Sequence, residues 1–97
     1  MEDKPAFVRT LANALVNQLA SNGLSAEVSC EPIPGTRMYR FYVVSDGFAE
    51  MMNSERQSLV WRIVDQALQP ADAIKISMIL TLTHDELGES QASAEAV

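Results

Sequence analysis

The residues that could carry out chemistry are few and widely spaced in this 97-residue chain. It has one cysteine, Cys30, and one histidine, His84, and neither belongs to a ligand pattern such as C-x-x-C. The four glycines do not form the G-x-x-x-x-G-K loop that binds nucleotides. Catalysis would need a nucleophile beside a base, paired carboxylates or a cluster of ligands, and the sequence shows none at suitable spacing. We therefore expect a non-enzymatic protein with no metal and no cofactor.

The composition is typical of one folded domain. Hydrophobic residues make up 47% of the chain and charged residues 21%, as in ordinary globular proteins. The longest apolar stretch, Ile76 to Leu82, is much shorter than the roughly 20 residues that span a membrane, and no apolar leader opens the chain. We expect a cytoplasmic protein without membrane contact, with a single domain over residues 1–88 and a disordered tail over residues 89–97.

The charge of the chain disfavours binding to nucleic acid. The formal net charge is −6, and the seven basic residues are scattered over the sequence. Affinity for a phosphate backbone depends on clustered Lys and Arg side chains that displace counterions. If the protein does bind nucleic acid, Arg56, Arg62 and Lys75 are the candidate contacts.

Apolar periodicity in the first half predicts a helix followed by a hairpin. Apolar residues recur every three or four positions over about residues 5–21, which is typical of an amphipathic helix. From Ala26 to Cys30 the period changes to two, so a strand with one buried face is expected. Pro34 and Gly35 favour a chain reversal, and a second, antiparallel strand is predicted over about residues 37–45.

The second half predicts two helices and a last strand. A short helical turn is expected at residues 48–52, and Ser54 with Gln57 has the spacing of a capping box that would open a longer helix. Pro70 should end that helix. Residues 74–83 then alternate as a strand, and Thr83 with Glu86 has the spacing of another capping box. Periodicity alone does not decide whether the last strand pairs with the first or with the second strand.

The segment Met38 to Val60 resembles the centre of a BolA domain. In that family an apolar strand ends in V-S-x-x-F, and a helix opening R-H-R-x-V follows at a fixed distance. Five residues match without a gap: Val44, Ser45, Phe48, Arg56 and Val60. The histidine of the opening is replaced by Gln57 and its second arginine by Ser58. The resemblance therefore implies the fold more strongly than the activity.

This resemblance implies a two-layer α+β (α/β) fold similar to a KH domain, in the order α-β-β-α-α-β with a possible final helix. It also implies a three-stranded mixed sheet with helices on one face. BolA relatives are partners of monothiol glutaredoxins and share or pass on an iron–sulfur cluster, held by a histidine near the last strand and a cysteine or histidine in the first hairpin loop. Here Lys75 stands at the histidine position and the loop reads Glu31 to Arg37. A protonated lysine cannot donate to iron, so we predict that conventional ligation is lost.

Three functional hypotheses follow. The first is an adapter or regulatory protein that binds a protein partner, such as a monothiol glutaredoxin, through the start of the long helix and the last strand; its candidate contacts are Arg56, Gln57, Trp61, Arg62 and Lys75. The second is a KH-like transcriptional regulator that binds nucleic acid, although residues 51–54 lack the G-x-x-G loop of a binding KH domain. The third is a self-associating domain, monomeric or weakly dimeric, that pairs through an exposed edge strand.

Overall fold

The three- and four-residue spacing of apolar side chains near the N-terminus forms helix α1, Ala6–Ser21. In the computed structural model, which describes residues 5–88, this helix buries one stripe of side chains against a sheet. Gly23 ends the segment with a φ of 80°, a left-handed conformation that glycine adopts without strain. The chain then enters β1, Glu27–Pro32. The predicted helix over residues 5–21 is therefore confirmed.

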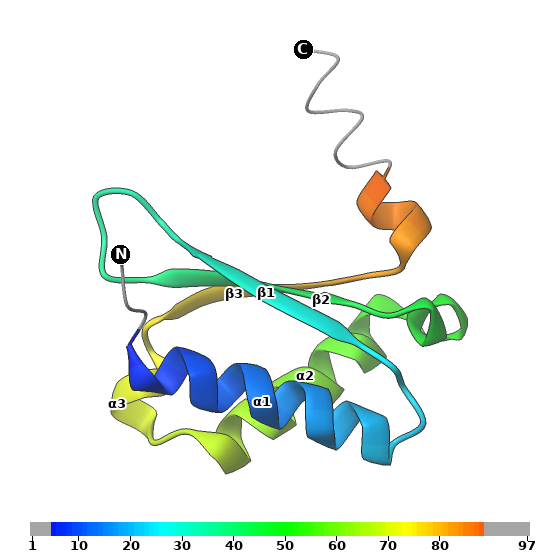
Figure 1. The fold of residues 1–97 in the computed structure, drawn as a ribbon, viewed down its shortest axis with the longest axis horizontal. Helices are drawn as coiled ribbons and strands as arrows, with labels where there is room; N and C mark the ends of the chain where they lie inside the picture. Colours follow the sequence, from blue (N-terminus) through cyan, green and yellow to red (C-terminus); the bar gives the residue numbers. More distant parts are fainter. Residues whose placement is uncertain (1–4, 89–97) are drawn as a thin grey trace.

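The sheet has three strands in the order β1-β2-β3. The central strand β2, Tyr39–Val44, is antiparallel to β1 and parallel to β3, Ile76–Leu82. Three helical elements form the connection from β2 to β3: the 3₁₀ helix η1 (Asp46–Glu50), α2 (Asn53–Ala67) and α3 (Pro70–Ala73). Figure 1 shows α1, α2 and α3 on the same face of the sheet. The fold is thus a small α+β domain with a three-stranded mixed sheet, as expected.

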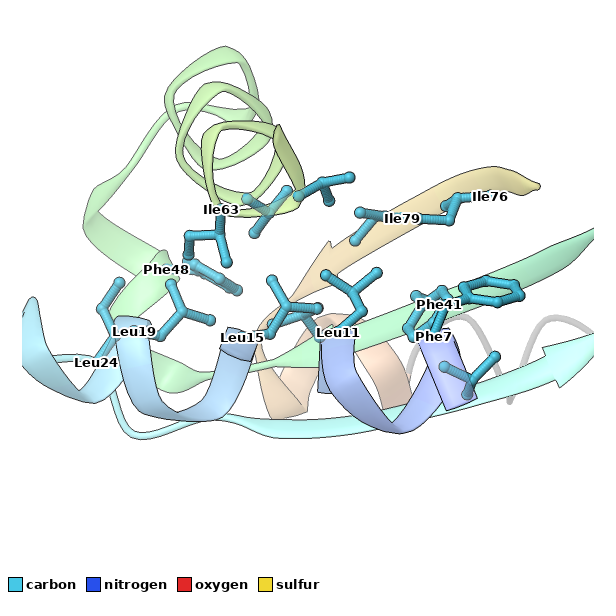
Figure 2. Close-up of a cluster of buried hydrophobic side chains, with 14 residues drawn as sticks. Phe7, Leu11, Leu15, Leu19, Leu24, Phe41, Phe48, Ile63, Ile76 and Ile79 are labelled. Carbon is cyan, nitrogen blue, oxygen red and sulfur yellow. The ribbon is translucent and has the colours of Figure 1, made fainter. Parts of the chain in front are cut away.

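The core lies between this sheet and the helices (Figure 2). Leu11, Leu15 and Leu19 of α1 are fully buried, as are Phe41 and Val43 of β2. Figure 2 shows Phe48 and Ile63 approaching the same cluster from η1 and α2. Each large aliphatic side chain buried in this way contributes roughly 1.5–3 kcal/mol relative to exposure. Cys30 is half-buried and packs against the cluster.

Strand β3 departs from simple alternation at its start. Ile76 and Ile79 are both buried, although an odd separation would place them on opposite faces. Tyr39 of β2 pairs with Ile76, but the next residue, Arg40, pairs with Met78, so the register shifts by one residue between them. This irregularity turns Ile79 toward the helices. Met78 consequently lies on the open face of the sheet, with 42% of its surface exposed.

Two sequence predictions about helix ends have different outcomes. Thr83 and Glu86 form the expected capping box: the Glu86 N–H donates to Thr83 Oγ1 at 3.1 Å and the Thr83 N–H donates to Glu86 Oε1 at 2.9 Å. They open a helical turn over residues 84–88. The predicted box of Ser54 and Gln57 is wrong. Helix α2 begins at Asn53, and Glu55 accepts from the Met52 N–H at 2.8 Å.

The long helix also ends slightly earlier than expected. Helix α2 ends at Ala67, and Pro70 opens the separate short helix α3, where a missing N–H costs no intrahelical bond. The predicted tail, residues 89–97, lies outside the described part of the chain, so the predicted domain boundary at residue 88 stays a prediction. None of the helices within residues 5–88 combines the length and the apolar character that crossing a membrane requires.

Candidate functional site

Arg56 is the most constrained of the predicted site residues. Only 7% of its surface is exposed, and its guanidinium lies over the Phe48 ring, 5.6 Å from the centroid. Nε donates to the Met51 carbonyl at 3.2 Å, and Nη1 donates to the Thr81 carbonyl at 3.0 Å. The same Nη1 lies 2.8 Å from Glu86 Oε1. Arg56 therefore joins the start of α2, the end of β3 and the final helical turn.

Glu86 is the acidic partner in this arrangement. Hydrogen bonds from Arg56, and then from the Thr83 N–H, hold the pKa of the Glu86 carboxyl below its usual value of 4.5. The carboxylate therefore stays ionised at neutral pH and neutralises the buried guanidinium. The pair gives Arg56 a structural role that the sequence analysis, which named it as a candidate partner contact, did not predict.

Gln57 lies on the side of α2 that faces the outer edge of β3. Its Nε2 donates to the Ile79 carbonyl at 2.9 Å and to Thr81 Oγ1 at 3.2 Å, while its Oε1 accepts from Trp61 Nε1 at 3.1 Å. The Leu82 carbonyl points toward β2, because it accepts from the N–H of Ser45, the residue that directly follows β2. Carbonyls of successive strand residues point to opposite sides, so the Ile79 and Thr81 carbonyls point away from β2. Gln57 and Arg56 thus occupy outward carbonyls of an edge strand.

A groove of about 400 Å³ runs between α2 and β3. Asn53, Gln57 and Trp61 line it from the helix, and residues 77–82 line it from the strand. None of these side chains is charged. Trp61 is half-buried and packs against the core as well as lining the groove. The sequence analysis missed Asn53 and Met78, whose only signal was their position beside the predicted helix start and strand.

The open face of the sheet continues from this groove. Strand β3 contributes Met78, Leu80 and Leu82 to it, and these residues pair in register with Arg40, Tyr42 and Val44 of β2. Val44 is only 6% exposed on this face, so burial is not limited to the helix-covered side. Further along the face, Glu31 accepts hydrogen bonds from the Tyr42 hydroxyl and from Arg40 Nη1, both at 2.8 Å. The face is therefore apolar along β3 and polar along β1.

The three candidate nucleic-acid contacts do not form one positive patch. Arg56 is buried against Glu86. Arg62 is exposed and lines a different cleft on α2, together with Glu55. Lys75 precedes β3, and its Nζ lies 3.6 Å from an Asp72 carboxylate oxygen. The geometry separates these cations and places a carboxylate near each of them.

His84 makes contacts that the sequence did not indicate. It is an exposed residue at the start of the final turn. Its Nε2 lies 2.7 Å from Glu27 Oε1, its Nδ1 lies 3.0 Å from Asp46 Oδ1, and its backbone N–H donates to the same Asp46 oxygen at 3.0 Å. Hydrogen bonding to Glu27, and then to Asp46, raises the pKa of His84 above 6.5. The contacts join segments up to 57 residues apart.

The described residues 5–88 contain no group of three or more His, Cys, Asp or Glu side chains arranged to hold a metal ion. Comparison with protein-family models, with curated proteins and with solved structures finds no match. The class that the coordinates define is a small α+β domain with helices on one face of a mixed sheet. Its candidate site is an uncharged groove at the edge of β3.

Proposed function

We propose that this protein is a BolA-like, KH-like adapter or regulatory protein that acts through contacts with a protein partner and has no catalytic activity of its own. The element order and the helices on one face of the sheet are the arrangement that the BolA resemblance implies, which supports the proposal. The observation on which it mainly rests is the groove between α2 and β3. It lies where the resemblance places the partner surface, at the start of the long helix and the last strand.

The chemistry of this groove suits a protein surface better than a charged ligand. Its lining joins apolar side chains, including Leu80 and the exposed Met78, to the neutral amides of Asn53 and Gln57. Interfaces commonly place Met and aromatic residues at their centre and polar groups at the rim. Trp61, which is half-buried, supplies the aromatic residue. We expect Met78, Leu80 and Trp61 to make the main apolar contacts.

The partner to test first is a monothiol glutaredoxin, because the resemblance implies it. In this proposal the chain contacts the glutaredoxin but supplies no ligand to an iron–sulfur cluster. Lys75 and the loop residues Thr36 and Arg37, which stand near the family's ligand positions, line one cleft and offer no neutral imidazole or thiolate. Reconstitution of the mixture with iron and sulfide tests this part. A cluster whose absorption spectrum changes on Lys75→Ala would contradict it.

Calorimetric titration with a purified monothiol glutaredoxin tests the contact itself. Met78→Glu places a charge in the groove and should weaken binding by about tenfold or more, since an interfacial charge without a partner costs more than 1.4 kcal/mol. Met52→Glu is the matched control, because Met52 is 72% exposed and does not line the groove. Equal affinity of the two variants would refute the assignment of the groove. Absence of binding by the wild-type chain would refute the choice of partner.

The nucleic-acid and self-association hypotheses receive no comparable support. Arg56, Arg62 and Lys75 lie apart. The outward carbonyls of Ile79 and Thr81 already accept side-chain donors, which makes this edge of the sheet less suited to pairing with a second copy.

A further inference from the structure

A second cleft, of about 360 Å³, is formed where three distant segments meet. Figure 1 shows the start of α1, the hairpin loop between β1 and β2 and the segment before β3 at one end of the sheet. Within residues 5–88, six residues line the cleft: Pro5, Phe7, Thr36, Arg37, Tyr39 and Lys75. The main-chain bond from the Tyr39 N–H to the Lys75 carbonyl, at 2.8 Å, fixes two of these segments to each other. The main-chain bonding of the sheet therefore holds the Tyr39 and Lys75 walls of the cleft in place.

Among the described residues, the lining of this cleft contains two cations and no carboxylate. Arg37 is exposed and makes no ion pair or hydrogen bond through its side chain with any other residue of the 5–88 region. The Lys75 ammonium forms an ion pair with the Asp72 carboxylate. The separation of 3.6 Å and the 46% exposure of the Lys75 side chain make this a weak surface pair. Of two other clefts in the described part of the chain, the one beside α2 contains both Glu55 and Arg62, and the one beside α3 contains Asp65. A cationic cleft is thus a local exception on a chain of net charge −6.

Aromatic side chains form the other walls. The Phe7 and Tyr39 rings meet edge to face, with centroids 5.7 Å apart. Lys75 Nζ lies 5.4 Å from the centroid of the Phe7 ring, a cation–π contact that holds the ammonium beside an aromatic wall. Pro5 adds a further apolar surface. The cleft therefore offers positive charge beside an apolar wall.

We propose that this cleft binds an oxyanion, a carboxylate or a phosphate ester, that is attached to a small apolar group. The guanidinium of Arg37 has the planar fork that pairs with two oxygens of such a group, and Lys75 supplies a point charge on the other side. The apolar group would lie against Pro5 and Tyr39. The volume is at the lower end of the range for small-molecule sites, roughly 300–1,000 Å³, which fits a ligand of about one ring. This proposal is independent of the proposed partner.

Titration of the isotope-labelled full chain, followed by amide NMR shifts, tests the site. The probes are phenyl phosphate and benzoate, with inorganic phosphate and phenol as comparisons. We expect saturable shifts at residues 36–39 and 75, with a Kd on the order of 1 mM for the better aromatic anion, and weaker binding of phosphate and phenol. The preferred aromatic anion identifies the oxyanion. Binding of phenol as tight as that of both anions, or shifts that never saturate, would overturn the proposal.

Charge variants give a second, independent readout. Arg37→Gln and Lys75→Gln should each weaken binding by about fivefold, as the loss of one partly exposed charge pair does. Arg62→Gln removes the same charge from a distant site and should leave the affinity unchanged. Asp72→Asn frees Lys75 from its competing carboxylate and should tighten binding about twofold. Equal weakening by the Arg62 variant would show a general charge effect, and weaker binding by the Asp72 variant would contradict the competition for Lys75. Either result would overturn the assignment.

Discussion

Replacement of Arg56 by methionine is the sharpest test of how this fold is held together. The substitution keeps an unbranched apolar stem against Phe48 but removes every donor of the guanidinium. It leaves the Thr81 carbonyl, in a residue only 4% exposed, without its side-chain donor. It also leaves Glu86 without its cation. The start of α2, the end of β3 and the final turn then lose their common link.

The expected loss can be worked from these contacts. A hydrogen bond to a charged group contributes about 1.5–3 kcal/mol, and breaking a buried ion pair by removing one partner costs about 3–5 kcal/mol. Glu86 has 42% of its side chain exposed and can recover water, which favours the lower end. We expect Arg56→Met to lower the free energy of unfolding by about 3 kcal/mol. This is a large part of the roughly 5–15 kcal/mol that stabilises a typical domain.

Urea denaturation, followed by circular dichroism and by the fluorescence of the single tryptophan, Trp61, measures this loss. Arg62→Met is the matched control, because Arg62 is exposed on the same helix and should change stability by less than about 0.5 kcal/mol. The ionised Glu86 has a lowered pKa, so its contribution is present above pH 4.5 and is lost as the pH falls through its folded-state value. The difference in the free energy of unfolding between wild type and Arg56→Met should therefore become smaller below pH 4.5. Equal stability of the Arg56 and Arg62 variants would refute the reasoning.

Other substitutions test separate features. Ile63→Asp places an unpaired carboxylate in the core, where Ile63 is 4% exposed, and should abolish the cooperative thermal transition; a variant that still melts cooperatively would contradict this. The raised pKa of His84 means that its contribution is complete below pH 6.5 and is lost as the pH rises through the folded-state value. The difference in urea midpoint between wild type and His84→Gln should therefore shrink on alkalinisation, and an NMR titration that gives an unshifted imidazole pKa would exclude the contact. In Gly47→Ala the new Cβ would meet a methyl group of Leu24, so we expect a loss of about 1 kcal/mol, and an unchanged melting temperature would argue against it.

The amphipathic elements were predictable because each follows one period. The leucines of α1 and the alternation of Phe41 with Val43 correctly place the core on one side of the sheet. The capping box of Thr83 and Glu86 was also predictable from the sequence, because both partners lie within one helical turn. Local spacing is sufficient wherever the interaction itself is local.

Interactions between distant segments were not predictable in the same way. Ser54 and Gln57 have capping-box spacing, but the Gln57 amide bonds instead to β3, 22 residues further along the chain. The register shift beside Ile76 depends on how β3 meets β2, which periodicity does not encode. The contact of Glu27 with His84 spans 57 residues and has no sequence signature. For the candidate site, the sequence correctly indicated the start of α2 and β3 as neighbours, but not the groove between them or the separation of the three cations.

The side-chain donors on β3 also have a consequence for behaviour at high concentration. An edge strand with unpaired main-chain groups can pair with the edge strand of another molecule, which is a first step toward fibrils. Gln57 and Arg56 occupy two of the β3 carbonyls that a neighbouring molecule would need for pairing. We therefore expect loss of the Gln57 amide to affect more than the stability of one molecule, because it frees an edge carbonyl for pairing with a second molecule.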